Sequence, residues 1–236
     1  MKPLRRVLMM AEMHGRDLTR RHVALALLVA LPLSFYLASS RSGSSAISAG
    51  GIGMAFAVSG AALFSVLSSS EVDQRLVLGG YRPVELLLGR LLFLGPLGLL
   101  IAAAFSTVMT LMSDPSRPWL LGLGVGVVAL QSVPLGLAVG AVVPHELEGT
   151  LVLIGVVGMQ MAVELTSPVS KFLPFYGPRQ LLAASLTENG ALLTPLLQTL
   201  AYGLGLLLIA RLFIARRVNV QRHRQLAATV GVPSEP

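Results

Sequence analysis

Long apolar runs, separated by short segments that hold most of the charged residues, recur along all 236 residues of the chain. An apolar α-helix of about 20 residues is long enough to cross the roughly 30 Å hydrocarbon core of a bilayer. Six such runs predict membrane spans at residues 22–40, 46–68, 91–112, 119–143, 149–165 and 190–214. Since no polar stretch is long enough to fold by itself, we expect residues 1–236 to form one all-α membrane domain.

The composition agrees with a chain that is solvated mainly by lipid. Hydrophobic residues make up 54% of the sequence and charged residues 12%, whereas about 25% of the residues of a soluble domain are charged. The absence of cysteine excludes disulfides, thiolate catalysis and Cys-ligated metals. The net charge of +7 does not indicate nucleic-acid binding, because Lys and Arg stand at the ends of apolar runs without interleaved aromatic residues.

The distribution of basic residues predicts the orientation, because Lys and Arg collect in cytoplasmic segments. One set of alternate segments holds Lys2, Arg5, Arg6, Arg16, Arg20, Arg21, Arg75, Arg82, Arg90, Arg211, Arg216, Arg217, Arg222 and Arg224. The other set holds Arg41, Arg117, Lys171 and Arg179. We therefore expect both termini in the cytoplasm. The low share of Lys hints at a GC-rich bacterial genome. The expected location is a bacterial inner membrane.

The two ends of the chain differ in character. Leu4, Val7, Leu8 and Ala11 recur at helical spacing within residues 1–21, which predicts an amphipathic helix in the membrane interface. A cleaved signal peptide is the alternative for residues 1–40. The polar residues 218–236 are expected to form a frayed tail.

Prolines follow the fifth predicted span closely. Irregular backbone at membrane depth is tolerated only where protein or water covers it. The stretch from Leu165 to Ser185 is therefore expected to form a re-entrant hairpin of short helices that lines a pathway.

The segment between the second and third spans, residues 69–90, alternates charge sign and is divided by Gly79 and Gly80. This pattern predicts two short helices that meet at a turn, the first along the membrane surface. An ordinary solvated loop is the alternative.

This segment resembles the cytoplasmic loop of ABC-2 type transporter permeases, especially those of the daunorubicin-exporter type. In that family an Arg, a leucine-rich turn, a second Arg and a Gly-Arg or Gly-Lys pair lead into the third span, and the matching residues here are Arg75, Leu76, Leu78, Arg82, Gly89 and Arg90. Gly80 stands where the family often has Pro, and Pro83 is displaced by one or two positions. The stretch from Thr166 to Pro178 resembles the family's proline-rich outer segment.

The resemblance implies a function and partners. The segment would couple the spans to a separate ABC ATPase subunit, through Glu71, Asp73, Arg75, Leu76, Tyr81, Arg82 and Glu85. ATP and Mg²⁺ would bind to that subunit, and no cofactor to this chain. A second permease copy, or a homologous permease, and membrane lipid complete the expected partners.

Polar residues inside the apolar runs are candidates for a translocation pathway. They are Gln131, Gln160 and Glu164, together with Pro168. Gln160 and Glu164 are one helical turn apart and are expected to share a helix face. The alternative is that Glu164 lies at the outer interface, solvated or paired with Lys171 or Arg179.

Catalysis is not expected. The sequence has no phosphate-binding G-x-x-x-x-G-K-[ST] motif and no H-E-x-x-H metal motif. Gly136 and Gly140 have the spacing of close helix packing. The leading hypothesis is the permease of an ATP-driven exporter of hydrophobic or amphipathic substrates. The alternatives are a six-span substrate-capture component of a modular importer and a non-transporting membrane assembly protein.

Overall fold

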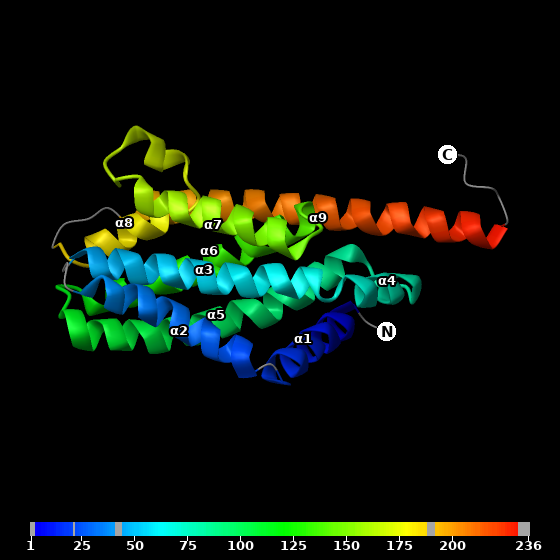
Figure 1. Cartoon of the computed structure of the whole chain (residues 1–236), viewed down its shortest axis with the longest axis horizontal. Helices are drawn as coiled ribbons and strands as arrows, with labels where there is room; N and C mark the ends of the chain where they lie inside the picture. Colours follow the sequence, from blue (N-terminus) through cyan, green and yellow to red (C-terminus); the bar gives the residue numbers. More distant parts are fainter. Residues whose placement is uncertain (1–2, 21, 41–43, 188–191, 231–236) are drawn as a thin grey trace.

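The computed structural model describes residues 3–20, 22–40, 44–187 and 192–230, and within these residues all regular secondary structure is helical. The helices are α1 (Pro3–Arg20), α2 (His22–Ala38), α3 (Ser44–Leu67), α4 (Ser70–Leu78), α5 (Pro83–Ser113), α6 (Pro118–Val142), α7 (Glu146–Ala162), η2 (Pro168–Phe172), α8 (Tyr176–Ala184) and α9 (Leu193–Val230). The longer helices run along one common direction. Helices α1 and α4 lie at one end of the bundle, the α4 end, and α8 lies at the other, the α8 end (Figure 1).

Helices α3 and α6 pack against each other at the centre of the bundle. A Cβ atom at Gly136 would lie only 2.1 Å from the Ser59 carbonyl oxygen and 2.6 Å from the Ala62 Cβ. A Cβ atom at Gly140 would lie 3.1 Å from the Leu63 carbonyl oxygen. Glycine therefore allows the two backbones to approach closely, and the predicted packing role of this pair is confirmed.

In the described part of the chain, four helices are long and apolar enough to cross a membrane: α3, α5, α6 and α9, the last over Leu193–Arg217. They agree with the second, third, fourth and sixth predicted spans, so the chain is a helical membrane protein. Helices α2 and α7 coincide with the first and fifth predicted spans, but each has only 17 residues, and neither belongs to these four helices.

Two predicted boundaries are wrong. Helix α5 begins at Pro83 rather than at residue 91, and helix α9 continues to Val230 through most of the predicted tail. Helix α9 continues because no Gly or Pro interrupts residues 215–230. Helix α5 begins early because Pro83 occupies its first turn, where no N–H partner is needed. Residues 190–191, assigned to the sixth span, and 231–236 of the tail lie outside the described residues.

The segment after α7 turns back on the bundle at the α8 end (Figure 1). It contains the short helices η2 and α8, of which α8 packs on α6 and α9. A Cβ atom at Gly177 would lie 2.4 Å from the Pro195 carbonyl oxygen, and Leu182 fills the space beside Gly51 and Gly124. The predicted short helices are present. The predicted re-entry concerns the depth of these helices in a membrane, and it stays a prediction.

Helix α1 is set at an angle to the bundle and packs on α5 (Figure 1). Met10 and His14 are buried, and Val7 and Ala11 are half-buried. Leu8, assigned in the sequence to the same apolar stripe, is 52% exposed. The helix is amphipathic as predicted, but its packed face is centred on Met10 and His14.

Candidate functional site

The 69–90 segment folds as a short helix, a tight turn and the beginning of a long helix. After α4, the backbone N–H groups of Gly79 and Gly80 donate to the carbonyl oxygens of Arg75 and Val77. Gly80 has φ of 89°, a left-handed conformation that glycine adopts without steric cost. The predicted turn is confirmed. The predicted second short helix is wrong, because these residues continue without a break into α5.

Glu85 fixes the beginning of α5. Its Oε2 accepts a hydrogen bond of 2.9 Å from the backbone N–H of Arg82, and Pro83 occupies the first helical turn, where no N–H partner is needed. An acidic residue in the first turn also interacts favourably with the helix dipole. Since Glu85 is buried, its carboxylate caps the helix and does not belong to the outer surface.

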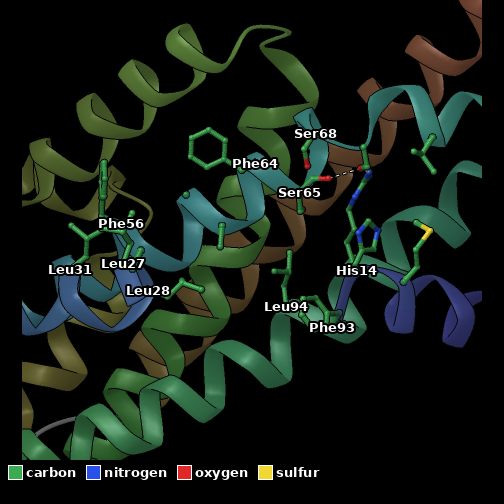
Figure 2. Close-up of a pocket in the computed structure, with 17 residues that line it drawn as sticks. His14, Leu27, Leu28, Leu31, Phe56, Phe64, Ser65, Ser68, Phe93 and Leu94 are labelled. Atoms are coloured by element: carbon green, nitrogen blue, oxygen red, sulfur yellow. Dashed lines mark hydrogen bonds between the residues drawn. The ribbon is translucent and has the colours of Figure 1, made fainter. Parts of the chain in front are cut away.

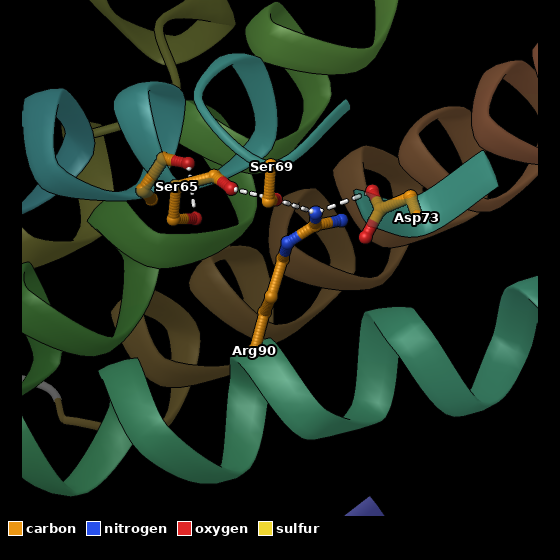
Figure 3. A network of polar contacts seen from close by, with 5 residues as sticks. Ser65, Ser69, Asp73 and Arg90 are labelled. Carbon is orange, nitrogen blue, oxygen red and sulfur yellow. Dashed lines mark hydrogen bonds and ion pairs between the residues drawn. The ribbon is translucent and has the colours of Figure 1, made fainter. Parts of the chain in front are cut away.

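Arg90 connects three helices at the α4 end. Its side chain is 0% exposed, and its Nη2 donates to Oδ2 of Asp73 at 2.6 Å and to Oγ of Ser69 (Figure 3). Ser69 Oγ donates in turn to the Ser65 carbonyl oxygen at 2.6 Å. The network joins α5 to α4 and to the end of α3.

The carboxylate of Asp73 loses hydration by being buried in this network. Burial raises the pKa of Asp73 above its ordinary value, and the charge of Arg90 and its hydrogen bond offset part of that rise. Removing one member of a buried ion pair leaves the other charge without compensation. The network therefore fixes α4 relative to α3 and α5.

Arg6 of α1 closes over the turn that follows α4. Its Nη1 donates to the Gly80 carbonyl oxygen at 2.8 Å, and its guanidinium lies 5.2 Å from the centre of the Tyr81 ring and 3.6 Å from the Glu85 carboxylate. One helical turn farther along α1, Met10 lies so close to α5 that a Cβ atom at Gly89 would be 2.5 Å from the Met10 Cβ. Helix α1 thus belongs to the same unit as α4 and α5.

The structure divides the predicted docking residues into two groups. Asp73 and Glu85 are buried in the contacts described above, and Leu76 and Tyr81 are half-buried. Arg75 and Arg82 are exposed, and the side chain of Glu71 lies outside the described part. Exposed apolar side chains complete this outer surface, namely Val72, Leu78, Val84 and Leu88.

No protein-family model matches the chain, and no curated protein matches it. The function is therefore argued from the geometry of the chain itself.

The predicted pathway residues lie in different surroundings. Gln131 on α6 is buried and donates to the Pro174 carbonyl oxygen at 3.4 Å. Gln160 on α7 is also buried, and neither polar atom of its side chain has a hydrogen-bond partner. Pro168 is exposed at the beginning of η2.

The prediction that Gln160 and Glu164 share a helix face is wrong. Helix α7 ends at Ala162, and Glu164 lies beyond it, exposed, where its carboxylate accepts a hydrogen bond of 3.5 Å from Thr166. Arg179, suggested as an ion-pair partner of Glu164, donates instead to the Val163 carbonyl oxygen at 3.0 Å.

A cavity of about 540 Å³ lies between α1, α2, α3, α4 and α5. Figure 2 shows its lining, in which Leu27 and Leu31 of α2 lie beside Phe56 of α3, and Phe93 of α5 lies beside His14 of α1. His14, Arg90 and serines from the end of α3 contribute polar groups. This volume is typical of ligand pockets, which range from about 300 to 1,000 Å³.

The sequence reasoning did not identify Arg90 and His14 as site residues. In the sequence, Arg90 stands next to a long apolar run and matches the permease pattern, but neither feature indicates a buried side chain. A signal was present in the serines at 65, 68 and 69, which recur at helical spacing on the end of an apolar span. In the described part of the chain, no group of three or more His, Asp or Glu side chains could hold a metal ion.

Proposed function

We propose that the chain is the permease subunit of an ATP-driven exporter of the ABC-2 type, and that the 69–90 segment binds a separate ATPase subunit. The substrate is hydrophobic or amphipathic, and a second permease completes the transporter. The chain lies in a bacterial inner membrane with both termini in the cytoplasm. Helices α2, α3, α5, α6, α7 and α9 are its six spans, and the segment with η2 and α8 re-enters from outside.

The rigid attachment of α4 is the observation that carries this proposal. An ATPase that moves on ATP binding must act on an element that transmits displacement to the spans. Helix α4 is fixed to two long helices through Arg90 and Asp73, and its turn is held by Arg6. A displacement of α4 would therefore move α3, α5 and α1 together.

The outer surface of α4 suits a protein partner. Exposed Arg75 lies among the apolar side chains of Val72 and Leu78, which are 41% and 60% exposed. Interfaces combine apolar contact with charges that set specificity and encounter rate. Arg is also enriched among the residues that dominate binding energy.

The distribution of charge supports the orientation. The α4 end collects the basic residues of α1, the 69–90 segment and the last part of α9, whereas Arg117, Lys171 and Arg179 belong to loops and short helices of the opposite end (Figure 1). Helices α2 and α7 have 17 residues each. This length is at the lower end of the range of about 17–25 residues for a transmembrane helix.

Charge reversal on α4 tests the function. The permease would be expressed with each candidate ABC ATPase of its source genome, copurified, and assayed for ATP-dependent efflux in vesicles. We expect Arg75→Glu to release the ATPase or to uncouple hydrolysis from efflux while the permease still inserts. The control is Arg16→Glu, which makes the same charge change at an exposed position of α1.

Two outcomes would contradict the proposal. The first is that the wild-type permease binds no ATPase, and the second is that deletion of residues 72–82 leaves efflux intact. Uptake of a ligand without an ATPase on α4 would instead indicate a substrate-capture component. Complex formation with another membrane protein and no transport would indicate an assembly protein.

A further inference from the structure

The cavity among α1, α2, α3 and α5 is a slot that follows one face of α3. Its lining on α3 begins with Phe56, Ala57, Gly60, Ala61 and Phe64 and continues with Ser65, Ser68 and Ser69. From Phe56 to Ser65 this face extends about 14 Å, at about 1.5 Å per residue. That length is about half of the roughly 30 Å hydrocarbon core, hence the depth of one leaflet.

The polar residues of the lining are confined to one end of the slot. Leu27, Leu28, Leu31 and Phe56 lie toward one end, whereas Ser65, Ser68 and His14 lie toward the other, together with Phe64, Phe93 and Leu94 (Figure 2). An amphiphile with a single long chain has the same arrangement, because its polar group is confined to one end.

Arg90 has unused donors at the polar end. Nη2 holds Asp73 and Ser69, whereas Nε and Nη1 are buried without a hydrogen-bond partner. A guanidinium carries five N–H donors in a planar fork that matches a carboxylate or phosphate. Buried donors without partners are rare, so these three N–H groups indicate a missing acceptor.

The exposed residues of the lining are mostly apolar, and Ser68 is the polar one among them. Leu27 is 53% exposed and Phe64 43% exposed, and Met13 is also exposed. An opening framed by large apolar side chains in a membrane protein faces lipid more favourably than water. The occupant therefore comes from the bilayer.

We propose that this slot binds one acyl chain of an anionic lipid, with the headgroup beside Arg90 and the serines at the end of α3. The surrounding charge favours an anion. Arg5, Arg75 and Arg82 are exposed at the same end of the molecule, and each basic residue near the surface contributes about 1 kcal/mol of attraction to anionic lipid. Asp73 is the acidic group that faces Arg90, and it occupies only Nη2.

The proposal does not depend on export, because it concerns lipid contact with this chain alone. It is tested on the purified full chain in nanodiscs of phosphatidylcholine that contain a small fraction of a photoactivatable lipid with a diazirine on its acyl chain. Three probes are compared: phosphatidylglycerol, phosphatidylcholine and a free fatty acid. Crosslinked peptides are located by mass spectrometry.

Gly60 offers a variant that fills the slot. A Cβ atom at Gly60 meets no atom within 4 Å, and the same is true of Gly155 on α7, away from the slot. Because the Cβ atom of a leucine at position 60 has room and Gly60 lines the cavity, Gly60→Leu adds apolar volume to the slot, and Gly155→Leu is the matched control.

We expect phosphatidylglycerol to label the peptides of α2 and α3 that line the slot, in preference to phosphatidylcholine. Gly60→Leu should reduce this labelling about tenfold, equivalent to a loss of about 1.4 kcal/mol, and Gly155→Leu should not. In Asp73→Leu/Arg90→Met the slot should still be labelled, but without preference for the anionic lipid. Labelling by the fatty acid in place of phosphatidylglycerol would identify a single-chain occupant.

Two results would overturn the proposal. One is equal labelling of the slot and of the outward faces of α5 and α9, unaffected by Gly60→Leu. The other is labelling of the slot with equal efficiency by phosphatidylglycerol and phosphatidylcholine in the wild-type chain.

Discussion

The buried pair of Arg90 and Asp73 makes an asymmetric prediction about the stability of the α4 end. Asp73→Leu removes the acceptor at 2.6 Å and leaves a guanidinium with 0% exposure and no counter-charge. A guanidinium does not lose its proton in a protein. The variant should therefore be destabilised by about 3–5 kcal/mol, the usual result of breaking a buried pair on one side.

Removing the other partner should cost less. In Arg90→Met the carboxyl group of Asp73 can take up a proton, and burial already raises the pKa of Asp73 above its ordinary value of 3.8. The cost should then approach about 1–3 kcal/mol, that of a buried polar group without a partner. Because a raised pKa favours the folded state at low pH, the stability of Arg90→Met should decline as the pH rises above 3.8 through the folded-state pKa.

The double variant Asp73→Leu/Arg90→Met removes both charges and fills the space with apolar atoms. Replacement of a buried pair by hydrophobic residues is often neutral or stabilising by about 1–4 kcal/mol. We therefore expect the double variant to be at least as stable as the wild-type chain.

Unfolding of the purified chain in mixed detergent and SDS micelles gives these free energies, with Arg75→Met on the exposed face of α4 as the control. A double variant as unstable as Asp73→Leu would refute the reasoning, because the loss could not then arise from an uncompensated charge. Equal effects of the two single variants at every pH would refute the asymmetry.

Three further predictions address other contacts. Arg6→Gln should release the turn after α4, and hydrogen exchange of residues 79–86 should increase while the core of α3 and α6 stays protected. Gly136→Ala should destabilise the bundle by about 1–3 kcal/mol or more through overpacking against α3, whereas Gly155→Ala, at an open position, should be neutral or slightly stabilising in an unfolding assay. Glu164→Gln should leave stability unchanged within about 0.5 kcal/mol because the side chain is exposed, and altered efflux at normal expression would assign it to the pathway.

The helices themselves could be predicted because apolar length and charge placement are local properties of the sequence. The turn at Gly79 and Gly80 could also be predicted, since two adjacent glycines end a helix. The early beginning of α5 was also present in the sequence. Pro83 followed by Glu85 is a favourable helix start, although the uncharged apolar run begins only after Arg90.

The direction of the charged side chains could not be predicted. An Arg at the end of an apolar run normally points to the interface, whereas Arg90 points inward because Asp73 and Ser69 lie beside it in the folded chain. The end of α7 is also determined by the fold and not by the local sequence. Nothing in the residues before Glu164 stops a helix, and the chain leaves α7 after Ala162 as it turns toward η2 and α8.

Arg90 belongs both to the support of α4 and to the polar end of the slot, and its donors separate the two roles. Nη2 is used for the contacts with α4 and α3, while Nε and Nη1 remain for an anion. Occupation of the slot therefore does not require α4 to be released. Conversely, Gly60 lies about 14 Å before Ser69 at a helical rise of about 1.5 Å per residue, so Gly60→Leu can exclude lipid from the slot without disturbing the network. Lipid binding and attachment of α4 are thus experimentally separable, although they use the same guanidinium.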